Sequence, residues 1–265
     1  MKGKTIYFGA AGSGRAYCQH TKTYPDFFID NDSSKWGTFI EGIEIKQPSV
    51  LESTMIEKII ITSGYVKEML PQLLSMGIDR DKIHSPAKSL LGFHIFKDQI
   101  NRIQTAKKLF QIMSELRENC KIVAVGGTAL GFARNKDFIL WDSDIDLFAP
   151  IRSKLEVFEF LKNLGYKPEY ELHSIKATMI LDNGVEVPIG IDLLDWGTDT
   201  FVDIFEDYSW VWPTKMFTEC SEIEVHGVKL NIPNPVDKYL RKIYGETWQT
   251  PNPNFAYSDY GGEKA

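Results

Sequence analysis

The chain has few cysteines, no long apolar stretch and no excess of basic residues. Its 265 residues include only Cys18, Cys120 and Cys220, and this odd, widely spaced set indicates neither a disulfide framework nor a zinc site. No stretch approaches the roughly 18 consecutive apolar residues of a membrane helix. The formal net charge of −6 argues against a broad attraction to nucleic acid. We therefore expect a cytoplasmic protein with no transmembrane segment and no nucleic-acid partner.

Several catalytic motifs are also missing. The sequence contains no GKS or GKT of a P-loop, and its five histidines show neither HxxxH nor HExxH spacing. We expect His173 and His226 to be surface or satisfied residues. An NAD-dependent sugar oxidoreductase would need a Tyr-Lys pair or a histidine base after its dinucleotide domain, and no such spacing is present. These absences argue against a P-loop enzyme, a histidine-ligated metalloenzyme and an NAD-dependent sugar oxidoreductase.

Residues 1–90 alternate between apolar runs and helical patterns, which predicts a small parallel α/β domain. The expected elements are strands at 4–9, 26–30 and 57–63 and a helix at 66–77, in which Pro71 indicates a kink or a later start. Glycines at 9, 12 and 14 follow the first strand, and Asp30 lies near the place of a ribose-binding acid.

This region resembles Rossmann-like domains of bacterial sugar-modifying proteins. The matching residues after the second strand are Ile29, Asp30, Asn31, Asp32, Trp36, Gly37, Gly42, Ile43 and Pro48. Such domains bind nucleotides or nucleotide-sugars in some proteins and serve assembly in others. The alternative role of the glycines is to permit tight strand–helix packing.

A second domain is predicted over 91–251, with the join near 85–96 and an irregular tail at 252–265. Its expected elements are helices at 97–118, near 153–164 and at 235–245, and strands near 166–172, 175–181 and 186–195. The last helix begins near Pro235 and ends at Gly245, in agreement with the rules for helix starts and stops.

The most informative segment runs from Gly126 to Pro150. A Gly-Gly-Thr turn follows the apolar run at 121–125, and Asp142, Asp144 and Asp146 then occupy alternate positions. On a strand, alternate side chains share a face, and two adjacent carboxylates repel each other unless a cation lies between them. Mg²⁺ (or Mn²⁺) favours carboxylates together with phosphate oxygens. The segment therefore predicts a metal-dependent phosphate-transfer site.

These aspartates have two alternative interpretations. An EF-hand loop would have a glycine where Leu147 stands and a glutamate where Ser153 stands. A solvated acidic turn would not need the apolar residues that are interleaved with the acids, Ile145, Leu147 and Phe148. Neither interpretation fits the segment as well as a metal site.

The segment resembles the LicD/fukutin family of phosphotransferases. The matching residues are Gly127, Thr128, Leu130, Gly131, Arg134, Phe138, Trp141, Asp142, Asp144 and Asp146, and a supporting match runs from Pro233 to Pro251. The resemblance covers roughly 100–251. It implies a nucleotidyltransferase-like fold and metal-dependent transfer of a phospho-alcohol, such as phosphocholine or ribitol phosphate, from a CDP-linked donor to a glycan. The expected fold is therefore α/β: a small parallel Rossmann-like domain, then an α+β nucleotidyltransferase-like domain with a mixed sheet.

Sites of this kind use a third carboxylate from a neighbouring strand. Asp192 is the best candidate because it lies in an apolar strand, where an acid is costly unless it is paired or bound to metal. Its alternative is a core partner of Lys or Arg, and Asp195 should face elsewhere. The metal ligands are thus predicted to be Asp144, Asp146 and Asp192. Asp142 shapes the turn, supports the metal shell or acts as a base.

Donor contacts are expected from Gly126, Gly127 and Thr128 at the turn, from Arg134, and more weakly from Lys176. Arg134 has the alternative of a salt bridge to one of the aspartates. Phe138 and Trp141 are more consistent with core packing than with stacking on a ligand.

Three functions remain open at this point. Attack on the distal phosphorus of the donor would release CMP, whereas attack on the proximal phosphorus would transfer a nucleotide. A third alternative is a nucleotide-sugar-binding assembly protein with a degenerate site. The transferred alcohol, the glycan and any homo-oligomeric state are not specified by the sequence.

Overall fold

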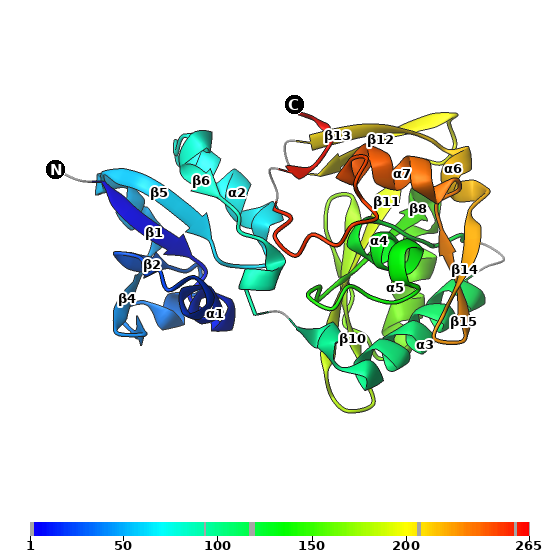
Figure 1. The fold of residues 1–265 in the computed structure, drawn as a ribbon, viewed down its shortest axis with the longest axis horizontal. Helices are drawn as coiled ribbons and strands as arrows, with labels where there is room; N and C mark the ends of the chain where they lie inside the picture. The colour runs from blue at the N-terminus through cyan, green and yellow to red at the C-terminus, as the bar shows by residue number, and fades with distance from the viewer. Residues whose placement is uncertain (1–2, 93, 117–119, 206–207, 257–258, 265) are drawn as a thin grey trace. The chain divides into compact units, whose positions relative to one another are not determined.

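The chain forms two compact units (Figure 1). The computed structural model describes residues 3–92, 94–116, 120–205, 208–256 and 259–264. The N-terminal unit is Met1–Phe93 with Asn252–Asp259, and the C-terminal unit is His94–Pro251 with Tyr260–Ala265. The change of unit after residue 93 lies within the join predicted at 85–96. The residues of the predicted tail, 252–265, are divided between the two units.

The N-terminal unit is built on one six-stranded sheet with the order β3-β4-β2-β1-β5-β6. All neighbours in it are parallel except β3 and β4, which pair antiparallel. Its elements are β1 (Lys4–Phe8), α1 (Gly12–Thr21), β2 (Phe27–Ile29), η1 (Ser33–Lys35), β3 (Phe39–Ile40), β4 (Ile43–Lys46), η2 (Pro48–Ser53), β5 (Ile56–Ile61), α2 (Val66–Ser75), η3 (Arg80–Lys82), β6 (Ile83–His84) and η4 (Lys88–Leu90). The predicted parallel α/β sheet is confirmed.

Helices cover both faces of this sheet. Side chains alternate along β1, so that Ile6 and Phe8 pack with Leu70 of α2, whereas Tyr7 packs on the opposite face with Cys18 of α1. Helix α2 begins at Val66 and contains Pro71, so the later helix start that Pro71 suggested is wrong.

The C-terminal unit contains a mixed five-stranded sheet with the order β7-β8-β11-β10-β9. Strands β8 and β11 are parallel, and the other neighbours are antiparallel. The elements up to this sheet's last strand are η5 (Ile95–Lys97), α3 (Gln99–Glu115), β7 (Val123–Ala124), α4 (Gly126–Asn135), β8 (Ile145–Pro150), η6 (Ile151–Ser153), α5 (Lys154–Asn163), β9 (Glu169–Tyr170), β10 (Ser174–Ile180) and β11 (Glu186–Leu194). The mixed sheet confirms the predicted fold class.

One face of this sheet carries the core. Ile145, Ile189 and Ile175, from β8, β11 and β10, pack in one apolar cluster with Leu109 of α3 and Leu161 of α5. The acids of β8 and β11 occupy the alternate positions and therefore face the other way. The helix predicted at 97–118 is α3, and its residues 117 and 118 lie outside the described part of the chain.

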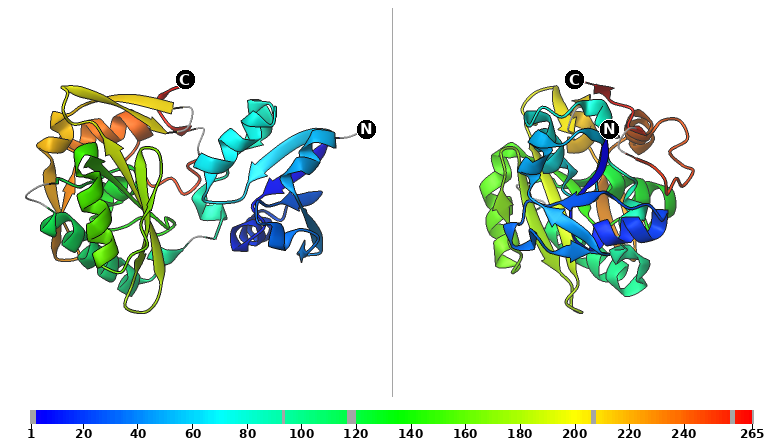
Figure 2. Two further views of the ribbon diagram at one scale, coloured as in Figure 1. Left: turned by 180° about the vertical axis from the view of Figure 1, so that it is seen from behind. Right: turned by 90° about the vertical axis from the view of Figure 1, so that its left-hand side faces the viewer.

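Two hairpins of this unit were not predicted. The remaining elements are β12 (Thr200–Phe205), β13 (Tyr208–Pro213), α6 (Lys215–Thr218), β14 (Ser221–Val225), β15 (Val228–Ile232), α7 (Val236–Tyr244) and β16 (Glu263–Lys264). Strands β12 and β13 form a long hairpin at the edge of the unit (Figure 2), and β16 pairs with β13. Phe201 of β12 and Phe217 of α6 pack against Phe148 on the acid-bearing face of the sheet.

Candidate active site

The Gly-Gly-Thr turn is the start of helix α4, directly after strand β7. Gly126 has a φ of +53°, and a Cβ there would lie 2.9 Å from Asp146 Oδ2. A Cβ on Gly127 would lie 2.4 Å from Asp142 Oδ2. The two glycines therefore allow both carboxylates to lie against the helix start, whose partial positive charge favours negative groups.

Thr128 joins this helix start to strand β8. Its buried hydroxyl accepts a hydrogen bond of 3.0 Å from the Asp146 amide, and the Val125 amide donates to the Asp146 carbonyl at 3.0 Å. Both bonds fix the backbone of Asp146, so its carboxylate has a defined place beside the turn. Thr128, predicted as a donor contact, therefore also has a structural partner.

Asp142 and Asp144 precede β8 in the same segment. Asp142 is buried, and its Oδ1 accepts from the Ser143 amide at 3.1 Å. Asp144 is half-buried and lies one residue before β8 begins, so it alternates with Asp146 along the chain. The structure thus brings the predicted glycines together with Asp142 and Asp146.

Asp192 lies on the same face of the sheet as Asp146. Asp146 stands opposite Gly190 in the parallel pair β8–β11, and Asp192 follows two residues later, opposite Phe148. The rise per residue and the spacing between strands place the Cα atoms of the two aspartates about 8 Å apart. Asp195 lies beyond the end of β11, is exposed, and accepts from the Gly197 amide, as expected for a residue outside the site.

No group of three His, Cys, Asp or Glu side chains is arranged to hold a metal ion, as far as the described residues go. Asp144, Asp146 and Asp192 are therefore not gathered into one ligand set. The carboxylates of Asp142 and Asp146 lie together beside the glycine turn, and one or two carboxylates suffice for Mg²⁺ when phosphate oxygens complete its coordination.

Arg134 and Lys176 differ in their surroundings. Arg134 lies in the last turn of α4, and its buried Nε has no hydrogen-bond partner among the described residues. Burial lowers the pKa of its guanidinium, and Tyr244 acts in the opposite direction. Lys176 faces the same side of the sheet as Asp192 but forms a 2.6 Å ion pair with Glu171. Arg134 is thus the better candidate for an incoming anion.

Tyr239 belongs to this site and was missed. It lies in α7, and its buried hydroxyl accepts a hydrogen bond of 2.9 Å from the Gly126 amide. Burial raises its pKa well above 10, and nearby Asp203 and Asp146 act in the same direction. The sequence points to this contact only indirectly: the glycine turn and the closing helix that carries Tyr239 both belong to the segments that resemble the family.

Other predictions concern residues around the site. Phe138 is buried and stacks on Phe96 with ring centroids 4.6 Å apart, which confirms core packing. His226 forms a 2.7 Å contact with Asp137, so it has the partner expected of a satisfied histidine. His173 is exposed.

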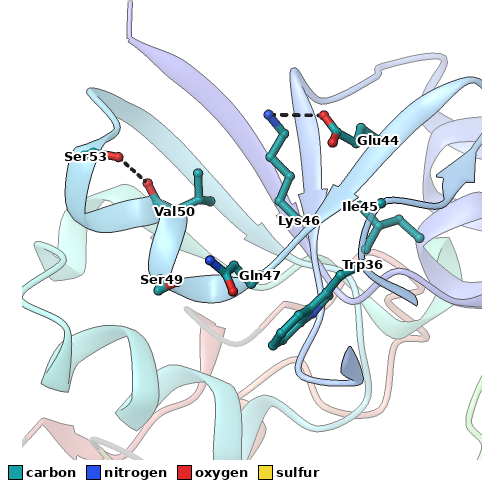
Figure 3. Close-up of a pocket in the computed structure, with 9 residues that line it drawn as sticks. Trp36, Glu44, Ile45, Lys46, Gln47, Ser49, Val50 and Ser53 are labelled. Carbon is teal, nitrogen blue, oxygen red and sulfur yellow. Dashed lines mark hydrogen bonds and ion pairs between the residues drawn. The ribbon is translucent and has the colours of Figure 1, made fainter. Parts of the chain in front are cut away.

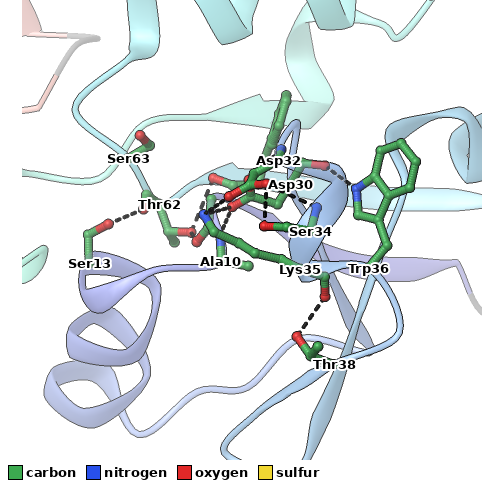
Figure 4. Close-up of polar contacts among 12 residues, drawn as sticks. Ala10, Ser13, Asp30, Asp32, Ser34, Lys35, Trp36, Thr38, Thr62 and Ser63 are labelled. Carbon is green, nitrogen blue, oxygen red and sulfur yellow. Dashed lines mark hydrogen bonds and ion pairs between the residues drawn. The ribbon is translucent and has the colours of Figure 1, made fainter.

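The glycine loop of the N-terminal unit adjoins a group of polar contacts that includes Ala10, Ser13 and Asp30 (Figure 4). A Cβ on Gly14 would lie 2.5 Å from the Gly9 carbonyl oxygen, whereas a Cβ on Gly12 would meet nothing within 4 Å. Asp30 is buried and accepts from the Ala10 amide at 2.8 Å and from Lys35 at 3.1 Å. These contacts support the packing interpretation of Gly9 and Gly14.

A pocket of about 470 Å³ opens elsewhere in the N-terminal unit, between β4 and η2 (Figure 3). Its lining residues are Trp36, Gly37, Glu44, Ile45, Lys46, Gln47, Ser49, Val50 and Ser53. The single cation of this lining, Lys46, is paired with Glu44 at 3.2 Å, so the pocket presents no unpaired positive charge for a phosphate.

Comparison with known proteins relates the C-terminal unit to nucleotidyltransferase domains. Residues 119–235 match the family model described as LicD/FKTN/FKRP, nucleotidyltransferase domain. This match confirms the resemblance to the LicD/fukutin family that the sequence shows. The matched range includes the glycine turn and the aspartates and ends at the cap of α7. No curated protein matches the chain.

Several solved structures are similar to parts of the chain. A lincosamide antibiotic adenylyltransferase, LnuA, bound to lincomycin, is 16% identical with a TM-score of 0.35, over 48% of this chain and 78% of that chain. ANT(2")-Ia in complex with adenylyl-2"-tobramycin is 20% identical with a TM-score of 0.37, over 49% and 68%. UDP-D-quinovosamine 4-dehydrogenase from Vibrio fischeri is 21% identical with a TM-score of 0.27, over 32% and 78%.

No helix in the described part of the chain is both long and apolar enough to span a membrane.

Proposed function

We propose that the chain transfers a phospho-alcohol from a CDP-linked donor to a hydroxyl of a cell-surface glycan or its precursor and releases CMP. The observation that carries this proposal is the placement of the Asp142 and Asp146 carboxylates against the Gly126–Gly127 helix start, within the residues that match the LicD family model. A backbone without Cβ atoms beside two carboxylates suits a metal-bound diphosphate.

The two carboxylates that alternate at the start of β8 are the proposed metal ligands. Asp144 and Asp146 would hold Mg²⁺ or Mn²⁺, and phosphate oxygens of the donor would complete the coordination. When bound, the metal supplies neutralisation of the charge on the donor diphosphate. The cradle at Gly126, where a Cβ would contact Asp146 Oδ2, is the structural feature that fits this group.

Arg134 and Asp192 have separate roles in the proposal. Arg134, with its buried and unpartnered Nε, binds the donor diphosphate by charge-assisted hydrogen bonds. Asp192, about 8 Å along the same face from Asp146, accepts the proton of the glycan hydroxyl. We favour this role over metal ligation because the three aspartates do not form one ligand set among the described residues.

The proposed transfer forms one bond to phosphorus, breaks one bond from it and moves one proton. The glycan oxygen forms a bond to the distal phosphorus, and the bond from that phosphorus to the bridging oxygen breaks. CMP leaves with the bridging oxygen, and the hydroxyl proton passes to Asp192. Positioning and charge neutralisation supply most of the acceleration, so no covalent nucleophile is needed.

A second candidate is transfer of the nucleotide itself. The description of the matching family model as a nucleotidyltransferase domain favours it. Attack on the proximal phosphorus would use the same carboxylates. The presence of the aspartates and the glycine cradle argues against the third candidate, an assembly protein with a degenerate site.

The test is release of CMP from a panel of CDP-linked alcohols by the full chain with Mg²⁺. We expect release with at least one donor, its loss in EDTA, and a more than hundredfold loss in Asp146→Asn, as is typical when a metal ligand is removed. Asp195→Asn is the matched control, since that exposed acid lies outside the site. Near-normal turnover in EDTA or in Asp146→Asn would contradict the metal site.

A further inference from the structure

We propose that Tyr239 is a positioning residue of the transfer site, which holds the Gly126 amide and so sets the glycine turn against Asp146. The catalytic effect that we expect from this hydrogen bond rests on the proposed function. The contact itself joins helix α7 to the first residue of α4, across 113 positions of the sequence.

The Gly126 amide needs a partner from outside its own helix. It is the first helical residue after the cap at Val125, and amides in the first turn of a helix have no carbonyl four residues earlier within the helix. The Tyr239 hydroxyl provides that partner at 2.9 Å. The tyrosine supplies what a capping side chain would, because Val125 offers no side-chain cap.

The Tyr239 ring is held rigidly. Its side chain is buried, and the ring packs on Trp212 at 4.9 Å and edge-on against Phe217 at 5.9 Å between centroids. A hydroxyl on a fixed ring is a rigid hydrogen-bond acceptor, so the amide that it holds is fixed as well.

Gly126 is therefore held on two sides. The Tyr239 hydroxyl holds its amide, and the Asp146 carboxylate lies where a side chain would begin, 2.9 Å from the Cβ position. A displacement of the turn changes the distance between the helix start and Asp146. Errors of about 1 Å in such placements cost about a hundredfold in rate.

The ionisation state of the hydroxyl agrees with this role. Burial raises the pKa of Tyr239 well above 10, so the hydroxyl is neutral at neutral pH. A neutral hydroxyl accepts from the Gly126 amide and adds no negative charge beside Asp146.

The test replaces Tyr239 by phenylalanine, which keeps the ring and removes the oxygen. The matched control is Tyr166→Phe, because Tyr166 is buried in the core of the same unit and its pKa is raised to about 12 by burial. Hydrogen exchange of the peptide that contains Gly126 is measured in both variants, together with kcat and KM for the CDP-linked donor and for the acceptor.

For Tyr239→Phe we expect faster exchange at the Gly126 amide and a fall of about 10- to 100-fold in kcat/KM for the donor, with the acceptor KM unchanged. Tyr166→Phe should change neither. Unaltered exchange at Gly126, or donor kinetics equal to those of Tyr166→Phe, would overturn the inference. If the wild-type chain releases CMP from no donor, the proposed function fails, and the exchange measurement still decides whether Tyr239 holds the turn.

Discussion

The backbone amide of Asp146 donates a 3.0 Å hydrogen bond to the Thr128 hydroxyl, which ties strand β8 to the first turn of helix α4. The two residues are 18 positions apart and belong to the two motifs that carry the site. Because Thr128 is buried, this bond is shielded from water and keeps the carboxylate of Asp146 in register with the glycine turn.

Replacing Thr128 by valine should weaken both the fold and the activity. Valine matches the shape of threonine but leaves the Asp146 amide without its acceptor, which costs about 1–3 kcal/mol. We expect activity to fall by about tenfold or more, because the carboxylate is no longer fixed. Thr128→Ser keeps the hydroxyl and should retain most activity. Urea unfolding and CMP release measure both effects, and equal activity of the two variants would contradict this role.

Gly127→Ala should reduce activity with little loss of stability. The new Cβ would lie 2.4 Å from Asp142 Oδ2, so the carboxylate has to move. The backbone at Gly127 has no positive φ, so alanine brings no conformational strain of its own. Gly12→Ala is the control, since a Cβ there meets nothing within 4 Å. A fully active Gly127→Ala enzyme would show that the place of Asp142 does not matter.

The C-terminal unit should lose stability in alkaline solution. Burial raises the pKa of the Cys120 thiol from 9.0 to about 11. Between these values the unfolded chain releases the proton that the folded chain keeps, so the free energy of unfolding falls as the pH rises. The contribution is complete below pH 9 and is lost progressively toward pH 11.

Cys120→Ser removes this contribution. Its free energy of unfolding should therefore fall less steeply between pH 9 and 11, by up to about 1.4 kcal/mol per pH unit relative to wild type. Urea unfolding at several pH values measures the two slopes. Parallel slopes for wild type and variant would show that the Cys120 thiol does not titrate in this way.

Asp30→Asn should destabilise the N-terminal unit. Asp30 accepts from the amides of Ala10 and Asp32 and from Lys35, and an amide side chain cannot accept all three bonds. We expect a loss of about 2–3 kcal/mol, seen as faster hydrogen exchange in β1 and β2. Asp79→Asn, which breaks one exposed ion pair with Lys82, should cost below about 1 kcal/mol. Unchanged exchange with lost nucleotide binding would make Asp30 a ligand residue instead.

The parts of the fold that could be predicted have strong local signals. The parallel strand β5, predicted at 57–63 and found at Ile56–Ile61, is a largely apolar run, and the closing helix is marked by Pro235 and Gly245 at its ends. The alternation of Asp144, Ile145, Asp146 and Leu147 identifies both a strand and its two faces. Most of the predicted site residues, including the glycines at the turn and the alternating aspartates, belong to local sequence patterns of this kind.

The missed parts depend on contacts between distant segments. The sequence between β12 and β13 contains no glycine, and what places β12 is the packing of Phe201 on Phe148. The β14–β15 hairpin is the exception, because its two-residue turn, His226-Gly227, has positive φ at both residues and is a local signal. Tyr239 reaches Gly126 only through the packing of α7 beside α4 (Figure 1). The ion pair of Lys176 with Glu171 depends on the β9–β10 pairing, which sets the two strands side by side.

The most direct test of the account is the mass of the acceptor after reaction. The full chain, Mg²⁺, a CDP-linked alcohol and a glycan acceptor are incubated, and both products are identified by mass spectrometry, with Asp146→Asn as the inactive control. The account predicts free CMP and an acceptor that has gained one phospho-alcohol through a phosphodiester bond. An acceptor that has gained a nucleotide, with the alcohol phosphate released, would contradict it.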